Sequence, residues 1–158
     1  MEIQTGVYVQ VAQRMADIMT VAYCGGTFDL LHPGHTRFFR WCAQNFDEVV
    51  AVVNRDEFAG RYKQAPVQCL PERMEMLESC RYIDRVVVNE GDEDSTKTIL
   101  EVQPTHVVNG SDWDRERLMR QMGLTQEFLD KNRIKIILCP LPRHFSTTEL
   151  KQRVRAQK

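Results

Sequence analysis

The chain has 158 residues, the usual length of one domain, and its 21 lysines and arginines nearly balance its 22 aspartates and glutamates, for a net charge of -1. This balance argues against nucleic acid or an anionic membrane surface as a partner. The longest apolar run, VVAVV at 49–53, is far shorter than the ~18 residues that a membrane span needs. The five cysteines include no Cys-x-x-Cys pair, which fits a reducing compartment. We expect a soluble, cytoplasmic protein with a small-molecule partner.

The first 19 residues form a separate region of the sequence. They lack the charged-then-apolar order of a secretory signal. We treat 1–19 as an N-terminal extension without an assigned role, and 20–158 as the functional domain.

Short β-branched runs alternate with helical patterns along residues 20–158. The expected strands are TVAYC (20–24), EVVAVVN (48–54), RVVV (85–88), THVVN (105–109) and IKIILC (134–139). The expected helices begin at 33, 71, 95, 114, 125 and 146. This alternation predicts an α/β fold, a single doubly wound (Rossmann-like) parallel sheet with helices on both faces.

Polar clusters follow three of the expected strands directly: GGTFDLLHPGH, NGSDW and PLPRHFSTT. In doubly wound sheets, ligands bind beyond the carboxyl ends of the strands, where the strand order reverses. The three clusters are therefore expected to meet at one edge of the sheet.

The first cluster has the residues of a phosphate site. Gly25 and Gly26 permit positive φ and a close approach of a ligand to the backbone. Pro33 suits the first turn of a helix, whose unpaired N–H groups attract an anion. His32 and His35 can then donate hydrogen bonds to the same anion. Taken alone, a His-x-x-His pair more often has no function or caps a helix. A zinc site is not indicated, because the sequence offers no third ligand near the two histidines.

The full motif around the two histidines favours a functional site over that simpler interpretation. GTFDLLHPGH resembles the signature of the HxGH nucleotidyltransferase superfamily. Further stretches resemble the cytidylyltransferase family, in particular the glycerol-3-phosphate cytidylyltransferase group: NRDEF, PERMEMLESCRYIDRVVV, NGSDW and STTELK. The resemblance implies an enzyme that transfers a cytidylyl group from CTP to a small phosphorylated alcohol, sn-glycerol 3-phosphate, and releases pyrophosphate. It also implies Mg²⁺ held mainly by the nucleotide phosphates, and a homodimer.

The resemblance also implies roles for individual residues. The expected catalytic residues are His32, His35 and Lys63. The expected nucleotide-binding residues are Gly26, Thr27, Phe28, Arg143, Ser146, Thr147 and Thr148. The expected substrate-binding residues are Arg61, Asp112 and Trp113. Simpler interpretations stay open for some of them. Ser146 can begin a capping box with Glu149, and Arg61 and Lys63 can be solvated cations in a surface loop. Asp112 can cap a turn, and Trp113 can pack against the core.

One departure from the family leaves the function less defined. The stretch PRHFSTT is two residues shorter than the family's corresponding segment and has no glycine, which puts the register of Arg143 in question. One alternative is an adenylyltransferase that uses ATP with a phosphorylated sugar, pantetheine phosphate or a flavin. Another is a catalytically silent nucleotide-binding module.

Overall fold

The computed structural model describes residues 19–62, 64–142 and 144–157. Two residues with expected roles, Lys63 and Arg143, lie outside the described residues, as does nearly all of the N-terminal extension. In the part of the chain that the structure describes, no helix is both long enough and apolar enough to cross a membrane.

The centre of the fold is a five-stranded sheet in which every strand pair is parallel. Its strands are β1 (Val21–Gly26), β2 (Glu48–Val53), β3 (Arg85–Val88), β4 (His106–Gly110) and β5 (Lys135–Cys139). Their order is β3-β2-β1-β4-β5. The chain winds outward from β1 to β3 and then crosses to β4, so the order reverses between β1 and β4. The expected ligand position is beyond the carboxyl ends of these two central strands.

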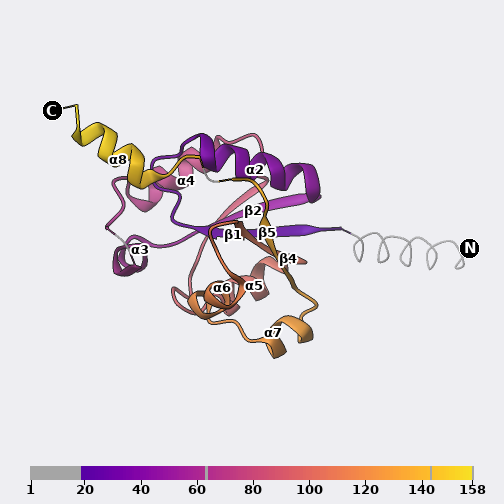
Figure 1. The fold of residues 1–158 in the computed structure, drawn as a ribbon. Coiled ribbons are helices and arrows are strands. Elements are labelled where there is room, and N and C mark those ends of the chain that lie inside the picture. Colours follow the sequence, from indigo (N-terminus) through magenta and orange to yellow (C-terminus); the bar gives the residue numbers. More distant parts are fainter. Residues whose placement is uncertain (1–18, 63, 143, 158) are drawn as a thin grey trace, which may run out of the picture.

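Helices cover both faces of the sheet, as the sequence predicted (Figure 1). One face carries α2 (Pro33–Asn45) and α4 (Leu70–Glu78), and the other carries α5 (Thr96–Val102), α6 (Arg115–Met122) and α7 (Gln126–Lys131). The last helix, α8 (Thr147–Arg155), lies on the same side as α2 and projects from the body (Figure 1).

Strand β2 explains why the fold has two cores. Its five consecutive valine and alanine residues at 49–53 are all buried, which is typical of a parallel strand covered on both faces. Val49, Ala51 and Val53 pack in the layer under α2 and α4. Val50 and Val52 pack in the layer under α5 and α6. The alternation that directs successive side chains to opposite faces thus fixes both helix layers.

One segment differs from the expectation. No helix was expected between the strand at 48–54 and the helix that begins at 71, but α3 (Asp56–Tyr62) lies there. Asp56 and Glu57 lie in the first turn of α3 and Arg61 lies in the last, which matches the helix dipole at both ends. Arg61 is therefore on a helix rather than in a loop.

Candidate functional site

A cavity of about 1340 Å³ opens at the carboxyl ends of the strands. Among the residues that line it are nine with expected roles: Gly26, Thr27, Phe28, His32, His35, Asp112, Trp113, Thr147 and Thr148. The segments that follow β1, β4 and β5 therefore meet at one edge of the sheet, as predicted. Ser146 and Arg61 are not part of this lining.

The two histidines form the start of α2. His32 is the N-cap, and its Nδ1 accepts a hydrogen bond from the N–H of Gly34 at 3.1 Å. The Nδ1 of His35 accepts the N–H of His32 at 3.4 Å, which completes a reciprocal capping box. Because Nδ1 is an acceptor in both rings, the proton of each neutral imidazole is on Nε2. The rings stack with centroids 3.8 Å apart, so the two Nε2–H groups act as neighbouring donors.

The turn before α2 is tight and leaves little room for other side chains. Phe28 and Leu30 have positive φ values of 54° and 50°, an uncommon conformation for such residues. A Cβ at Gly26 would lie 2.9 Å from the ring of Phe28, and one at Gly34 would lie 2.8 Å from His32. The glycines thus allow close packing, while the left-handed conformation falls on Phe28 and Leu30 rather than on the two glycines of β1.

Asp29 joins three segments beneath the cavity. Its side chain, in a residue only 5% exposed, accepts hydrogen bonds from the N–H groups of Val67 and Gln68, both at 3.0 Å. It also forms an ion pair with Lys151 at 2.9 Å, and its carbonyl accepts the hydroxyl of Thr147 at 2.9 Å. Burial alone would raise the pKa of Asp29, but these donors lower it below its ordinary value. Asp29 therefore braces the turn and holds the start of α8 against it.

Ser146 caps α8 by accepting the N–H of Glu149 at 3.1 Å. This is one half of the expected capping box. The capped first turn brings Thr147 and Thr148 to the cavity. The two helix starts, of α2 and α8, therefore face the same space.

Arg73 is fully buried and ties the other loops together. Its guanidinium donates to the carbonyls of Thr27, Asn54 and Gln68 and to the carboxylate of Asp56. Arg73 therefore has a structural role, with Asp56 as its ion-pair partner. The contacts fix the ends of β1 and β2 relative to α3.

The expected acceptor-binding cation, Arg61, is engaged in ion pairs. It contacts Asp92 at 3.2 Å and Glu93 at 3.0 Å, and Arg55 contacts Asp92 at 2.8 Å. Arg55 lowers the pKa of Asp92 below its ordinary value. This network ties α3 to the segment after β3 through two acidic residues of that segment, Asp92 and Glu93.

The segment after β4 is held by local packing. The N–H of Trp113 donates to the carbonyl of Gly110 at 3.2 Å, and the indole lies 4.8 Å below the guanidinium of Arg117. Ser111 donates to the carbonyl of Leu141, which joins the segments after β4 and β5. Trp113 therefore packs, as its simpler interpretation held, and also lines the cavity.

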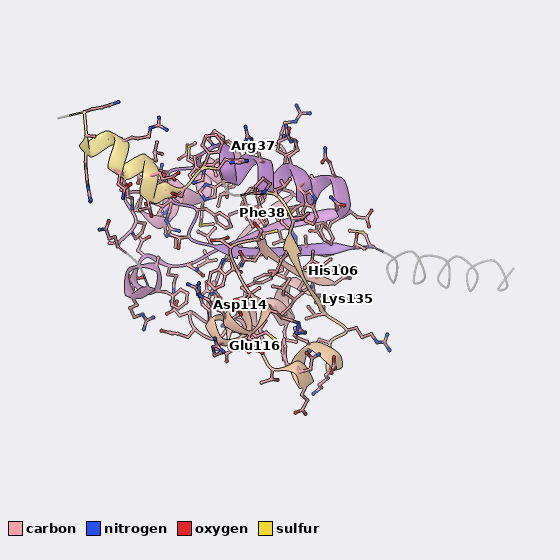
Figure 2. The ribbon with its side chains drawn as sticks, in the orientation of Figure 1. Arg37, Phe38, His106, Asp114, Glu116 and Lys135 are labelled. Carbon is pink, nitrogen blue, oxygen red and sulfur yellow. The ribbon has the colours of Figure 1, made fainter. Side chains whose placement is uncertain are left out.

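His106 lies away from this site. Figure 2 labels it beside Lys135, its register partner, at the amino ends of β4 and β5. Burial, and then the charge of Lys135, lower the pKa of His106 below its ordinary value. Its ring packs 5.0 Å from that of Phe46, so its role is structural.

The described residues provide few metal ligands. No group of three or more histidine, cysteine, aspartate or glutamate side chains in 19–62, 64–142 and 144–157 could hold a metal ion. The carboxylate of Asp29 is already occupied by two N–H groups and Lys151.

Several lining residues had no expected role. Lys151 and Arg37 line the cavity, and the guanidinium of Arg37 lies 4.9 Å from the ring centroid of Phe145. Asn54, the first residue of NRDEF, also lines the cavity but was not given a role of its own. Lys151 follows Thr147 by four residues on a helix, which places both on one face.

Comparison with known proteins agrees with this geometry. Residues 23–153 match the family described as Cytidylyltransferase-like. The chain belongs to this family. The assignment to the nucleotidyltransferase superfamily is thereby confirmed.

Two named relatives are similar to the chain. The FAD synthase of Pyrococcus abyssi is 34% identical over 112 residues, which cover 66% of this chain and 75% of that protein. The Bifunctional protein HldE of Nitrobacter hamburgensis is 30% identical over 138 residues, which cover 85% of this chain but 27% of that protein. The expected similarity to glycerol-3-phosphate cytidylyltransferases has no support in these relatives, because neither carries that name.

Solved structures share the fold. The lipopolysaccharide core biosynthesis protein from Thermoplasma volcanium has a TM-score of 0.61 and 27% identity, over 75% of this chain and 96% of that one. Pantothenate synthetase from Thermus thermophilus has a TM-score of 0.55 at 15% identity, over 87% of this chain and 64% of that one, and shows the fold alone.

Proposed function

We propose that the chain transfers an adenylyl group from ATP to the phosphate of FMN, giving FAD and pyrophosphate. The observation that carries the proposal is the meeting of two capped helix starts, α2 with its stacked histidines and α8, around one cavity at the reversal of strand order. This arrangement suits a triphosphate, because α2 provides the Nε2–H groups of two stacked histidines and α8 provides the positive end of its helix dipole with the N–H groups of its first turn. The FAD synthase relative supports adenylyl transfer to a flavin, because the match covers three quarters of that enzyme.

The chemistry needs positioning and charge stabilisation rather than a protein nucleophile. A phosphate oxygen of FMN attacks the α-phosphorus of ATP, and the bond to the β-phosphate oxygen breaks as pyrophosphate leaves. The Nε2–H groups of His32 and His35 donate to the phosphates as charge grows on the departing pyrophosphate. A preorganised donor of this kind lowers a barrier by roughly 3 kcal/mol. The hydroxyl of Thr148 and the backbone N–H groups at the start of α8 complete the donor set, while the hydroxyl of Thr147 donates to the carbonyl of Asp29 and fixes the position of that helix start.

Mg²⁺ would be held mainly by the ATP phosphates, since the described side chains provide no cluster of ligands for it. When bound, it neutralises phosphate charge. The protein's own part is to orient the triphosphate between α2 and α8.

The size of the cavity is consistent with two bound molecules. A pocket for one small ligand is about 300–1,000 Å³, and this cavity is about 1340 Å³. We place the nucleotide along β4, α2 and α8, and FMN along the ends of β2 and β3. Phe58 and Met122, both buried, give that second wall an apolar surface suited to a flavin ring.

A phosphorylated sugar is the second candidate acceptor. The observation that favours it is the similarity to the lipopolysaccharide core biosynthesis protein from Thermoplasma volcanium, which is 27% identical and covers 75% of this chain, since the core of a lipopolysaccharide is built from sugars. CTP with sn-glycerol 3-phosphate, the pair expected from the sequence, is the third and has no support in the named relatives.

The test is a matrix of two nucleotides and three acceptors with Mg²⁺. ATP and CTP are each combined with FMN, a sugar 1-phosphate and sn-glycerol 3-phosphate, and pyrophosphate release and nucleotide products are measured. We expect FAD and pyrophosphate in equal amounts from ATP with FMN. His35→Ala should lose this activity and His106→Gln, altered outside the cavity, should keep it. If another nucleotide and acceptor react and no FAD forms, the substrates are those two molecules. If ATP binds but no combination reacts, the chain is a catalytically silent nucleotide-binding module.

A further inference from the structure

Asn54 has a side-chain hydrogen-bond donor at the cavity wall that none of the described residues accepts. It follows β2 directly and lines the cavity at the wall we assign to FMN. Its backbone is fixed at both ends: the N–H donates to the carbonyl of Gly26 at 2.9 Å, and the carbonyl accepts from Arg73 at 2.8 Å. The side chain therefore starts from a rigid position.

A buried neighbour determines which way the Asn54 amide points. Asn89 is 3% exposed, and its Nδ2 donates to the carbonyl oxygen of Asp92 at 3.0 Å. A carbonyl oxygen can only accept, so the group of Asn89 on that side must be the nitrogen. The same nitrogen lies 3.1 Å from the Asn54 side chain, which must therefore present its oxygen. The hydroxyl of Thr98, which donates to the Asn89 oxygen at 3.3 Å, fixes the opposite end.

The consequence is a donor directed away from Asn89. With Oδ1 engaged, the Nδ2 of Asn54 carries two N–H groups, and none of the described residues accepts from them. The nitrogen is not sealed in the core, because every fully buried side-chain nitrogen or oxygen among the described residues has a partner. A buried, polar network that ends in one unused donor at a cavity wall is suited to ligand recognition.

We infer that Asn54 is a specificity-determining residue that donates a hydrogen bond from Nδ2 to an oxygen of the bound acceptor, FMN. This inference rests on the proposed function. Asn89 is a positioning residue, because it acts only by holding the Asn54 oxygen. The nucleotide lies on the other side of the cavity and is not contacted by Asn54.

Two substitutions distinguish the loss of the Nδ2 donor from changes in the size or charge of the side chain. Asn54→Asp keeps the size and the oxygen that Asn89 needs but cannot donate when ionised. Asn54→Ala removes the donor without adding a negative charge near the FMN phosphate. Asn45→Asp, at the exposed end of α2 and outside the cavity, is the matched control.

The measurement is FMN binding by quenching of flavin fluorescence, with a non-hydrolysable ATP analogue and Mg²⁺ present, together with binding of that analogue alone and the thermal midpoint. We expect a Kd for FMN raised about tenfold in both Asn54 variants, the loss of one hydrogen bond of ~1.4 kcal/mol. The analogue Kd should stay within about twofold, and Asn45→Asp should match the wild type.

Two results would overturn the inference in distinguishable ways. If the wild type binds FMN and both Asn54 variants bind it equally well, or lose the ATP analogue instead, Asn54 is not an acceptor contact while the proposed function stands. If the wild type does not bind FMN at all, the proposed acceptor is wrong and the role of Asn54 falls with it.

Discussion

Replacing Asp29 with asparagine should destabilise the fold and detach the start of α8. The substitution keeps the size of the side chain but removes the charge that Lys151 pairs with at 2.9 Å. The N–H groups of Val67 and Gln68 both reach Oδ1, so the amide oxygen at that position keeps these two contacts. The new NH₂ group then takes the place of Oδ2 and faces the ammonium of Lys151, which is left without an acceptor.

The contacts allow the size of the effect to be worked out. Removing one partner of a buried ion pair lowers the free energy of unfolding by ~3–5 kcal/mol. Because the side chain of Lys151 is 17% exposed, we expect the lower end of this range, about 3 kcal/mol. For a domain of this size, 1 kcal/mol corresponds to ~2–4 °C in Tm, so the midpoint should fall by about 6–12 °C. Asp130→Asn, at an exposed position on α7, is the control and should change Tm by less than about 2 °C.

Thermal unfolding by circular dichroism, with and without the ATP analogue, is the assay. Because the pKa of Asp29 is lowered, its contribution is complete at neutral pH and is lost as the pH falls below the ordinary aspartate range. The measurement is therefore made at pH 7. A midpoint for Asp29→Asn equal to that of Asp130→Asn would refute the reasoning, since it would mean that the ion pair contributes nothing net.

Three further predictions concern other groups. His32→Asn should change Tm by less than about 2 °C, because asparagine is also a good N-cap. It should lower kcat about 100-fold, because the Nε2–H donor is lost. An unchanged kcat would remove His32 from the mechanism. His106→Gln should flatten the dependence of the unfolding free energy on pH. Because the pKa of His106 is lowered by folding, the unfolded chain takes up the proton at a higher pH than the folded protein does, so wild-type stability falls as the pH drops through the ordinary histidine range. If the unfolding free energies of the two proteins, measured with urea from pH 7.5 to 5, depend on pH equally, this is contradicted. Arg73→Lys should lower stability by about 3 kcal/mol, because three N–H groups cannot replace a planar guanidinium with four acceptors; a midpoint near that of the wild type in the same unfolding assay would show that the geometry of the guanidinium is dispensable.

The sheet and its helices could be predicted because each element carries its own pattern. The run at 49–53 is apolar at every position, which distinguishes a doubly covered strand from an amphipathic one. The helix from Pro33 begins with proline at its first turn. Helix α3 was missed because its start depends on Asp56, whose carboxylate is held by Arg73, a residue 17 positions later. No local pattern reports that contact.

The site was predictable in part, for a related reason. The segments that hold Gly26, Asp112 and Thr147 each follow a strand, and parallel strands bring such segments to one edge. The orientation of Asn54 could not be predicted, because it is set through Asn89 by the backbone oxygen of Asp92. The engagement of Arg61 with Asp92 and Glu93 likewise depends on segments that are distant in the sequence.

The two interpretations of the histidine pair, helix cap and phosphate donor, are compatible because they use different atoms. Capping engages Nδ1 of His32 and of His35, and by accepting N–H groups there it forces the proton of each neutral ring onto Nε2. The cap therefore selects the tautomer that can donate to a phosphate. Stacking at 3.8 Å fixes the two rings relative to each other before any ligand arrives. The structural role of these histidines is thus the cause of their preorganisation, and preorganised donors lose little reorganisation energy when charge develops on the leaving pyrophosphate.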